Sequence, residues 1–343
     1  MIMKISIKQL STITGFSPAT ISNALNKKPG VNKTTADIIF KAAVDSGYMQ
    51  NAKITSIRLI VYKKHGIILA DTPFFSELIA GVENAGREYG YETVICHLDR
   101  QSENYDKHLK TILDDNTTAN LVLATELETE DMTPFQNALC PVVMIDGWFE
   151  DMSFSAVLIN NTDAMFNATT YLIANGHTKI GYLKSSVSIQ NFYCRQSGFL
   201  RALSKAGIQY HPEYIISLFP TMDGAYKAMN KCLDTQPVHL PTAFCADNDI
   251  IALGACKALK EHGYDIPKDV SVIGFDDISF CDISSPPLTT IRVFKQEMGA
   301  IAVRQLVNMI KTGTKVKTKV QICTEFVERE SVKKMITKET MRK

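Results

Sequence analysis

The segment that decides the fold covers residues 243–293 and reads AFCADNDIIALGACKALKEHGYDIPKDVSVIGFDDISFCDISSPPLTTIRV. An apolar run at 243–246 precedes a helical pattern over 249–262, and a second apolar run follows at 270–275. A short β-rich run, a helix and another β-rich run are the unit of a parallel, doubly wound sheet. Such sheets bind ligands at the carboxyl ends of their strands. The polar residues that directly follow the two runs are Asp247, Asn248, Asp249, Asp276 and Asp277.

The same alternation of strands and helices extends toward the N-terminus and occurs twice. We expect strands at 67–70, 93–97, 121–124 and 142–145, and, after a break near 155–162, further strands at 180–183, 214–218, 243–246 and 270–275. The intervening helices are expected at 75–90, 103–115, 131–138, 163–175, 191–206, 222–233 and 249–262. Two similar halves of this kind predict two α/β lobes around a ligand-binding cleft.

The first fifty residues have a different pattern, that of short helices. Ser6 is a candidate N-cap for a first helix, and Gly15 supplies the permissive backbone of a tight turn. Ser17 and Pro18 then start a second helix, because proline at the first helical position needs no N–H donor. The helices are expected at about 6–14, 18–25 and 33–46. We expect the third helix to close a small core with Ile38, Ile39, Ala42 and Ala43. This arrangement is typical of a DNA-reading helix-turn-helix, although plain helical hairpins share it.

Charge is distributed unevenly between the two parts. The chain has 37 Lys+Arg and 36 Asp+Glu among 343 residues, for a net charge of +1. Residues 1–64 contain ten basic and two acidic residues, a net of +8, so the remainder must have a net of −7. A basic module joined to an acidic body indicates a polyanion as the partner of the first and a different ligand for the second.

Composition indicates a soluble, intracellular protein of two or three domains. We find no apolar run of bilayer length and no secretory signal, and we expect no membrane partner. The eight cysteines lack a C-x-x-C pair, which favours reduced thiols over disulfides or a zinc site. We therefore expect a cytoplasmic location, with no metal and no cofactor.

The N-terminal run ISIKQLSTITGFSPATISNALNKKPGVNKTTADIIFKAAVDSGY resembles the headpiece of the lactose/galactose-repressor family of bacterial transcription regulators. Segment 243–293 also resembles this family, whose body is similar to periplasmic sugar receptors, and the resemblance extends to about residue 330. It implies an all-α helix-turn-helix headpiece plus an α/β two-lobed periplasmic-binding-protein-like domain with parallel sheets. The expected parts are a headpiece at 1–48, a hinge at 49–65 and an effector-binding and dimerisation domain at 66–335. The expected lobes are 66–160 with 292–318, and 161–290 with 320–332.

The resemblance also implies which residues contact DNA. Pro18, Ala19 and Asn23 match base-reading positions, whereas the residues expected at phosphates are Ser17, Thr20, Ser22 and Asn26. Many members have arginine at the place of Asn23. Since asparagine pairs with adenine and arginine with guanine, we expect an A·T pair in the half-site where those members prefer G·C.

A hinge helix is implied after Tyr48, with an apolar wedge that enters the minor groove. Asn51 matches the family, Gln50 replaces its usual proline, and Ile57 falls at the wedge position. In the alternative, Ile54 and Ile57 pack the linker onto the body. The basic stretch 58–66 is expected near the DNA backbone.

Effector positions follow from the same resemblance. The residues carried over are Asp146, Asn161, Arg195, Asn248 and Asp276. Asp71, Phe74 and Phe75 are expected in a loop over the cleft, where either phenylalanine is an apolar platform or a core residue, and Trp148 is expected to stack on the ligand. Helix capping is the alternative for Asp249.

These observations predict a ligand-responsive transcriptional regulator and not an enzyme, because the sequence lacks a nucleophile elbow and a phosphate-binding loop. The expected partners are a pseudo-palindromic double-stranded DNA operator, a small effector such as a sugar or sugar derivative, and a second copy in a homodimer, with a tetramer as the alternative. A purine is another candidate effector. A hydrolase and a solute receptor are the alternatives in other classes.

Overall fold

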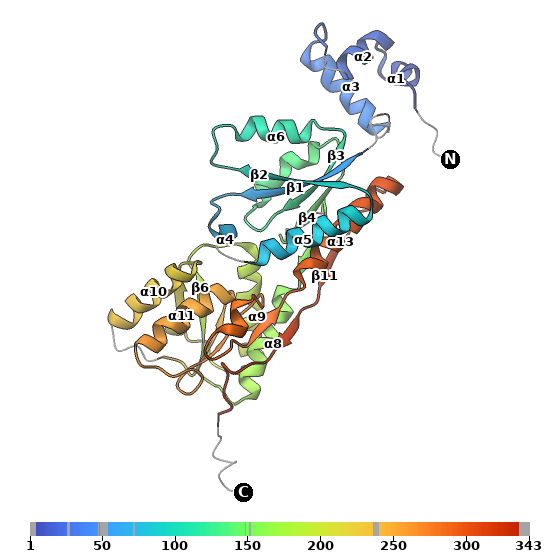
Figure 1. Cartoon of the computed structure of the whole chain (residues 1–343). Helices are drawn as coiled ribbons and strands as arrows, with labels where there is room; N and C mark the ends of the chain where they lie inside the picture. Colours follow the sequence, from blue (N-terminus) through green and yellow to red (C-terminus); the bar gives the residue numbers. More distant parts are fainter. Residues whose placement is uncertain are drawn as a thin grey trace.

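The computed structural model describes residues 5–25, 28–46, 48, 54–70, 73–147, 149–150, 152–235 and 240–335. Figure 1 shows a headpiece of three short helices and a body of two α/β lobes. The predicted fold class is therefore confirmed. No helix within the described ranges is long and apolar enough to cross a membrane.

The headpiece contains α1 (Ile7–Thr14), α2 (Pro18–Leu25) and α3 (Lys33–Asp45). Ser6 and Gln9 form a capping box at the start of α1, and Gly15 ends this helix with a left-handed backbone at φ 74°. The buried core consists of Leu10, Ile21, Ala24, Ile39 and Ala43. Ile38, which we expected in this core, is 48% exposed, because it lies one position from the inward face of α3.

Lobe 1 contains a six-stranded sheet of order β11-β5-β4-β3-β1-β2, in which neighbouring strands are parallel. Its strands are β1 (Ser56–Lys63), β2 (Glu92–Asp99), β3 (Thr118–Leu123), β4 (Val142–Ile145), β5 (Ser155–Ile159) and β11 (Lys319–Ile322). Its helices are α4 (Ile67–Ala70), α5 (Phe74–Glu88), α6 (Tyr105–Leu113), α7 (Thr129–Met132) followed by a 3-10 turn (Thr133–Asn137), and α13 (Lys295–Thr312).

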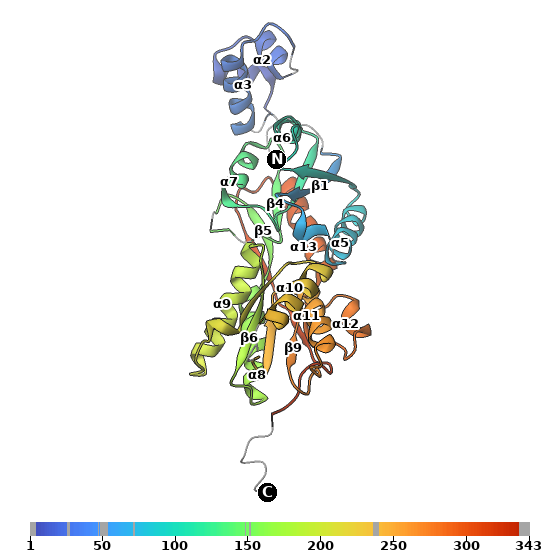
Figure 2. The same cartoon turned by 90° about the vertical axis from the view of Figure 1, so that its left-hand side faces the viewer.

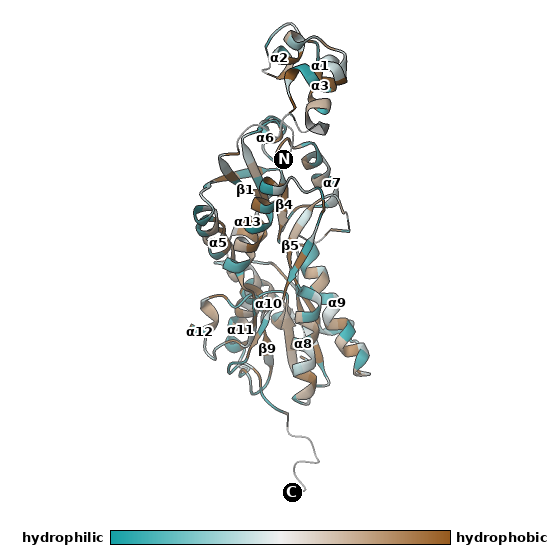
Figure 3. Cartoon of the chain, turned by 90° about the vertical axis from the view of Figure 1, so that its right-hand side faces the viewer, coloured by the Kyte–Doolittle hydropathy of each residue, from teal (hydrophilic) through white to brown (hydrophobic). Residues whose placement is uncertain are grey.

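Alternate residues of β1 face opposite sides of this sheet. Ile57, Leu59 and Val61 pack in the core that contains α5 and α13, whereas Ile60 and Tyr62 pack in the core that contains α6. Figure 3 shows α13 beside β4 in brown, with hydrophilic segments on α5 and α9. A strand buried on both faces belongs to the centre of a doubly wound sheet.

Lobe 2 contains a four-stranded parallel sheet of order β7-β6-β8-β9. Its strands are β6 (Ile180–Ser185), β7 (Ile215–Leu218), β8 (Ala243–Ala246) and β9 (Ser271–Ile273). Its helices are α8 (Asn161–Ala174), α9 (Gln190–Lys205), α10 (Met222–Thr235), α11 (Asp249–Glu261) and α12 (Phe280–Ile283), with a 3-10 turn at Pro212–Tyr214. Helices α8 and α9 contribute to the core on one face, and α10 and α11 to the core on the other.

The chain passes between the lobes more than once. It leaves lobe 1 after β5, enters lobe 2 at α8 and returns through β10 (Thr290–Arg292) to α13. After β11 it forms β12 (Glu325–Val327), which pairs antiparallel with β10. Both lobes are therefore discontinuous in sequence.

The first strand of the body lies earlier than we expected. Residues 67–70 form α4 and not a strand, and β1 occupies 56–63, inside the stretch that we expected as a hinge at 49–65. Glu126 explains the helix: its carboxylate accepts hydrogen bonds from the backbone N–H groups of Lys64, His65, Gly66 and Ile68, at 2.8–3.1 Å. These four donors are turned toward one side chain and are not available for a sheet.

Candidate functional site

The DNA-facing candidates are grouped at the start of α2. Ser17 Oγ accepts from the Thr20 backbone N–H at 3.1 Å, so Ser17 caps the helix. Pro18 and Ala19 are exposed, and Ser22 and Asn23 are partly exposed. The buried face of the same helix consists of Ile21 and Ala24. Asn26 and Asn51 lie outside the described residues.

The interpretation of Ile57 as a minor-groove wedge is wrong. Ile57 is fully buried in β1, opposite Thr93 of β2 and Ala119 of β3. Ile54 also packs against this core. Moving Ile57 into DNA would remove an apolar side chain from the body, which costs free energy in proportion to the area exposed. The alternative, in which Ile54 and Ile57 pack onto the body, fits the structure.

The basic residues of stretch 58–66 belong to lobe 1. Arg58 pairs with Asp115 at 2.6 Å, and Lys64 pairs with Glu128. Both charges therefore have acidic partners in the body, and their place near the DNA backbone stays a prediction.

Asp146 is the centre of a buried contact between the lobes. Thr125 Oγ1 donates to Asp146 Oδ2 at 2.6 Å, within lobe 1. From lobe 2, Asn191 Nδ2 donates to Asp146 Oδ1 at 2.9 Å and to its backbone carbonyl at 3.1 Å. Lobe closure in this structure therefore includes direct hydrogen bonds between Asp146 and α9.

Arg195 extends this contact into lobe 2. Its Nε donates to Asn161 Oδ1 at 2.8 Å, and Asn161 in turn donates to Asn191. A second guanidinium nitrogen lies 3.3 Å from Asp276 Oδ1, and a third donates to the Asp247 carbonyl. The structure thus brings together Asp146, Asn161, Arg195 and Asp276, all of which we predicted as effector-binding residues. Their polar groups, however, form hydrogen bonds mainly with one another and with neighbouring side chains, as one buried network.

The backbone and charge of the network are both unusual. Asp146 and Asp276 have positive φ angles of 59° and 114°, which are rare for residues other than glycine and are found mostly where structure or function requires them. Burial raises the pKa of Asp276 to about 7, and those of Asp146 and Asp247 to about 6. The positive charge of Arg195 opposes this rise at all three carboxyls.

Three other residues that we predicted to bind the effector have structural roles instead. Phe74 and Phe75 are buried in the main core, with ring centroids 5.0 Å apart in an edge-to-face arrangement, so the core alternative holds for both. Asn248 Oδ1 accepts from the Ile251 backbone N–H and caps α11. The capping role that we considered for Asp249 therefore belongs to Asn248. Asp71 and Trp148 lie outside the described residues.

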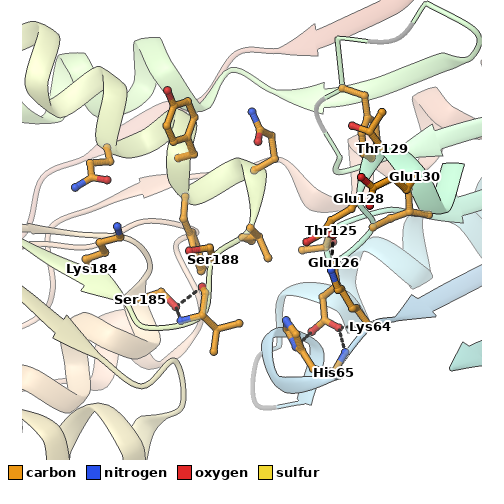
Figure 4. A pocket seen from close by; sticks show the side chains of 18 residues that line it. Lys64, His65, Thr125, Glu126, Glu128, Thr129, Glu130, Lys184, Ser185 and Ser188 are labelled. Atoms are coloured by element: carbon orange, nitrogen blue, oxygen red, sulfur yellow. Dashed lines mark hydrogen bonds and ion pairs between the residues drawn. The ribbon is translucent and has the colours of Figure 1, made fainter. Parts of the chain in front are cut away.

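A cavity of about 630 Å³ lies between the lobes. Figure 4 shows residues of lobe 1, including Lys64, His65 and Glu128, across the cavity from Lys184, Ser185 and Ser188 of lobe 2. Its lining has polar and aromatic side chains from both lobes: Lys64, His65, Thr125, Glu126, Leu127, Glu128, Thr129, Glu130, Phe149, Lys184, Ser185, Val187, Ser188, Ile189, Gln190, Phe192, Tyr193 and Gln196.

None of the predicted effector residues within the described ranges lines this cavity, although Thr125 connects it to Asp146. Sequence reasoning missed Lys184, Glu126 and the residues of α9 that line this cavity, such as Gln190, Tyr193 and Gln196. A signal existed for Lys184 and Glu126. Lys184 directly follows the predicted strand 180–183, and Glu126 lies just after the predicted strand 121–124, so both are at carboxyl ends of strands.

Comparison with known proteins agrees with this architecture. Residues 169–332 match the family model of the periplasmic binding protein-like domain. The transcriptional repressor PurR of Pasteurella multocida (strain Pm70) is 30% identical over 332 residues, which cover 96% of this chain and 98% of the relative. The solved complex of the transcriptional regulator CelR with cellobiose has a TM-score of 0.73 at 24% identity, and covers 96% of this chain and all of that one. The lac repressor dimer bound to operator and the anti-inducer ONPF has a TM-score of 0.70 at 21% identity, with the same coverage.

The chain belongs to the lactose/galactose-repressor family of transcription regulators. Its relatives are helix-turn-helix transcriptional repressors, which places it in a family of regulators and not of enzymes.

Proposed function

We propose that this chain is a cytoplasmic transcriptional repressor that binds a pseudo-palindromic operator as a homodimer and responds to a small effector bound between its lobes. The observation that supports this most directly is the combination of a capped helix-turn-helix, α1 to α2, with a two-lobed body that encloses a polar cavity. A solute receptor has no use for such a headpiece.

On DNA, the start of α2 enters the major groove. Pro18 and Ala19 offer apolar contacts, for instance to a thymine methyl, and Asn23 hydrogen-bonds to adenine. The residues placed at phosphates are Ser17, Thr20, Ser22 and Asn26. These assignments predict a half-site with an A·T pair opposite Asn23.

Exposed apolar side chains support the homodimer. β2 is an edge strand of the lobe 1 sheet, and its Val94 and Ile95 are 47% and 40% exposed. On lobe 2, Phe280 and Ile283 of α12 are 43% and 77% exposed. Figure 2 shows α12 on the same side of the molecule as α5, the helix that packs on β2. A second copy that covers this side would bury these side chains and place two headpieces for two half-sites.

The effector acts by changing lobe closure. A ligand that binds one closure state more tightly shifts the population toward it, and the bonds between Asp146 and Asn191 are the contact that closure makes or breaks. A coupling of about 1–3 kcal/mol changes operator affinity by roughly 5–150-fold.

One experiment tests the proposal as a whole. The purified full-length chain selects sequences from a random duplex pool, and binding to the selected site is measured by fluorescence anisotropy at several salt concentrations. We expect a two-fold symmetric site, one DNA per two chains, and affinity that falls steeply with salt as phosphate contacts release counterions. A monomeric chain that retains no duplex in dilute buffer would refute the function.

A further inference from the structure

Two consecutive residues at the end of β3 hold the segments that follow both neighbouring strands. In the lobe 1 sheet, β3 lies between β4 and β1. Thr125 donates to the carboxylate of Asp146, which follows β4, and Glu126 accepts from the backbone of residues 64–68, which follow β1. We call residues 64–68 the β1 loop. The carboxyl end of β3 therefore organises the lobe 1 side of the interlobe cavity.

The Glu126 carboxylate has little acceptor capacity left for a ligand. Its Oε2 accepts from the N–H groups of Lys64, His65 and Gly66 at 3.0, 3.1 and 2.8 Å, and its Oε1 accepts from that of Ile68 at 2.9 Å. A carboxylate has about four acceptor positions, so these donors use them. The side chain is also fully buried. Glu126 thus lines the cavity without being available to bind what enters it.

Gly66 gives the β1 loop the shape of an anion site. Its φ of 71° is in the left-handed region, which glycine adopts without steric cost. Successive N–H groups around a residue of this conformation point to one side and form a concavity that binds anions. In this chain the anion is a side chain located 60 residues further along the sequence. The β1 loop is therefore an anion site that the protein fills with its own carboxylate.

The β1 loop also presents two side chains to the cavity. Lys64 and His65 belong to the lining, and Figure 4 shows them next to Glu126 on the lobe 1 side. The Lys64 ammonium pairs with Glu128, and His65 Nδ1 lies 3.1 Å from Glu126 Oε1. The positions of both side chains depend on the backbone that Glu126 holds.

We propose that Glu126 is a positioning residue: its carboxylate acts as a tethered anion that fixes the β1 loop, and with it the lobe 1 wall of the cavity, and it does not contact the effector. This inference rests on the proposed function, because it concerns the cavity to which that function assigns the effector. Without the carboxylate, the N–H groups of the β1 loop are free to bind a small anion from solution.

Hydrogen exchange of the full-length native chain is the first test. We expect the backbone amides of Lys64, His65, Gly66 and Ile68 to exchange within about tenfold of the rates in β1, although they lie beyond the strand, since closed hydrogen bonds protect amides. In Glu126→Ala they should exchange at least about 100-fold faster. Glu128→Ala is the matched control, because it removes a carboxylate that contacts the Lys64 side chain and leaves the backbone bonds intact. Rapid exchange in the native chain, or equal rates in the two variants, would overturn the proposal.

Formate separates a tethered anion from a side chain that only fills space. We expect about 0.1 M sodium formate to raise the melting temperature of Glu126→Ala by roughly 2–4 °C relative to sodium chloride at equal ionic strength, because an anion that binds only the folded state stabilises it. The native chain and Glu128→Ala should not respond. An equal response in all three chains, or none in Glu126→Ala, would contradict the assignment.

Glu126→Gln keeps the test valid if the alanine variant does not fold. The amide has nearly the size of the carboxylate, but it turns an N–H donor toward one set of N–H groups. We expect a lower melting temperature and faster exchange in the β1 loop, since at least one backbone donor loses its acceptor. Native stability and native exchange rates in Glu126→Gln would show that only the size of the side chain matters, and would refute the role of its charge.

Operator binding measured on the same samples separates this inference from the proposed function. A native chain that binds no duplex, but whose β1 loop amides are protected, refutes the proposed function and leaves the role of Glu126 in lobe 1 standing. A chain that binds its operator, but whose β1 loop amides exchange freely, refutes only the role of Glu126.

Discussion

In the headpiece, the residues proposed to contact DNA around α2 lie within positions 17–26, whereas the network between the lobes joins residues from Thr125 to Asp276. The headpiece surface follows from local signals, namely the capping residues and Gly15, and from a core of five buried side chains. The cleft depends on how two sheets and their connections are placed. A local recognition surface is therefore sensitive to changes in its own few residues, and the cleft is sensitive to changes in the packing of the whole body.

The largest effect is expected for Arg195→Met, which leaves Asp276 and Asn161 buried without their cation or donor. We expect the free energy of unfolding to fall by about 3–5 kcal/mol, because removing one partner of a buried ion pair leaves the other charge buried and unpaired. Urea denaturation followed by far-UV circular dichroism measures it. The control is Arg201→Met, whose exposed pair with Asp163 should contribute at most about 1 kcal/mol. Equal losses in both variants would contradict the assignment of Arg195 to a buried ion pair whose loss costs more than that of an exposed one.

Ile57→Ala distinguishes a body residue from a DNA wedge. A fully buried isoleucine truncated to alanine should cost about 2–5 kcal/mol of the free energy of unfolding. Ile13→Ala, at a side chain that is 58% exposed on α1, should change it by no more than about 0.5 kcal/mol. If Ile57→Ala keeps full stability and loses operator affinity, the wedge interpretation returns.

Stability should fall as pH rises toward neutrality. The carboxyls of Asp276, Asp146 and Asp247 have raised pKa values of about 7, 6 and 6, against 3.8 in the unfolded chain. Raised pKa values mean that the folded state binds more protons, so the associated stability is present below pH 4 and is lost as pH rises through 6–7. Each unit of rise corresponds to about 1.4 kcal/mol.

Thermal melting between pH 5 and pH 8 measures this dependence. We expect a lower melting temperature at pH 8, and a weaker slope in Asp276→Asn, which has no carboxyl to titrate. Asp163→Asn serves as the comparison. The Arg201 side chain lowers the pKa of this exposed carboxyl, so the carboxyl does not titrate between pH 5 and pH 8. If melting temperature depends on pH equally in the native chain and in Asp276→Asn, the Asp276 carboxyl is not the source of the pH dependence.

The smallest effect concerns the headpiece alone. Asn23→Arg should change the preferred base pair from A·T to G·C at one position of each half-site, with about 1–3 kcal/mol of discrimination, and should leave the stability of the body unchanged. Selection from a random duplex pool, with the native chain in parallel, reports the preference. An identical preference in both would exclude Asn23 as a base-reading residue.

Much of the fold was predictable where the signals are local. The strands at 142–145 and 243–246 lie at their predicted positions, and α8, α9, α10 and α11 each begin and end within two residues of the prediction. One of the exceptions is informative. Ile67–Ala70 has the composition of a strand, but it forms α4 because Glu126, far along the chain, accepts hydrogen bonds from the N–H groups before it.

The candidate site was predictable only in part. Asp146 and Asp276 directly follow predicted strands, Arg195 lies in the predicted helix 191–206, and all three belong to one buried network. No local signal indicates that they bond to the network and not to the cavity, or that Gln190 and Tyr193 face the cavity, because the orientation of α9 toward lobe 1 is a property of lobe packing.

The sequence by itself determined most of the helices and parallel strands, the capped helix-turn-helix and the class of regulator, because capping, periodicity and the identities of turn residues act over a few positions. Only the tertiary structure decided that Ile57 belongs to a sheet, that Arg58 and Lys64 are paired within the body, and that α9 faces the cavity. These outcomes depend on burial and on ion pairs between distant segments, and the free energy of such contacts is set by three-dimensional packing and not by neighbours in the chain.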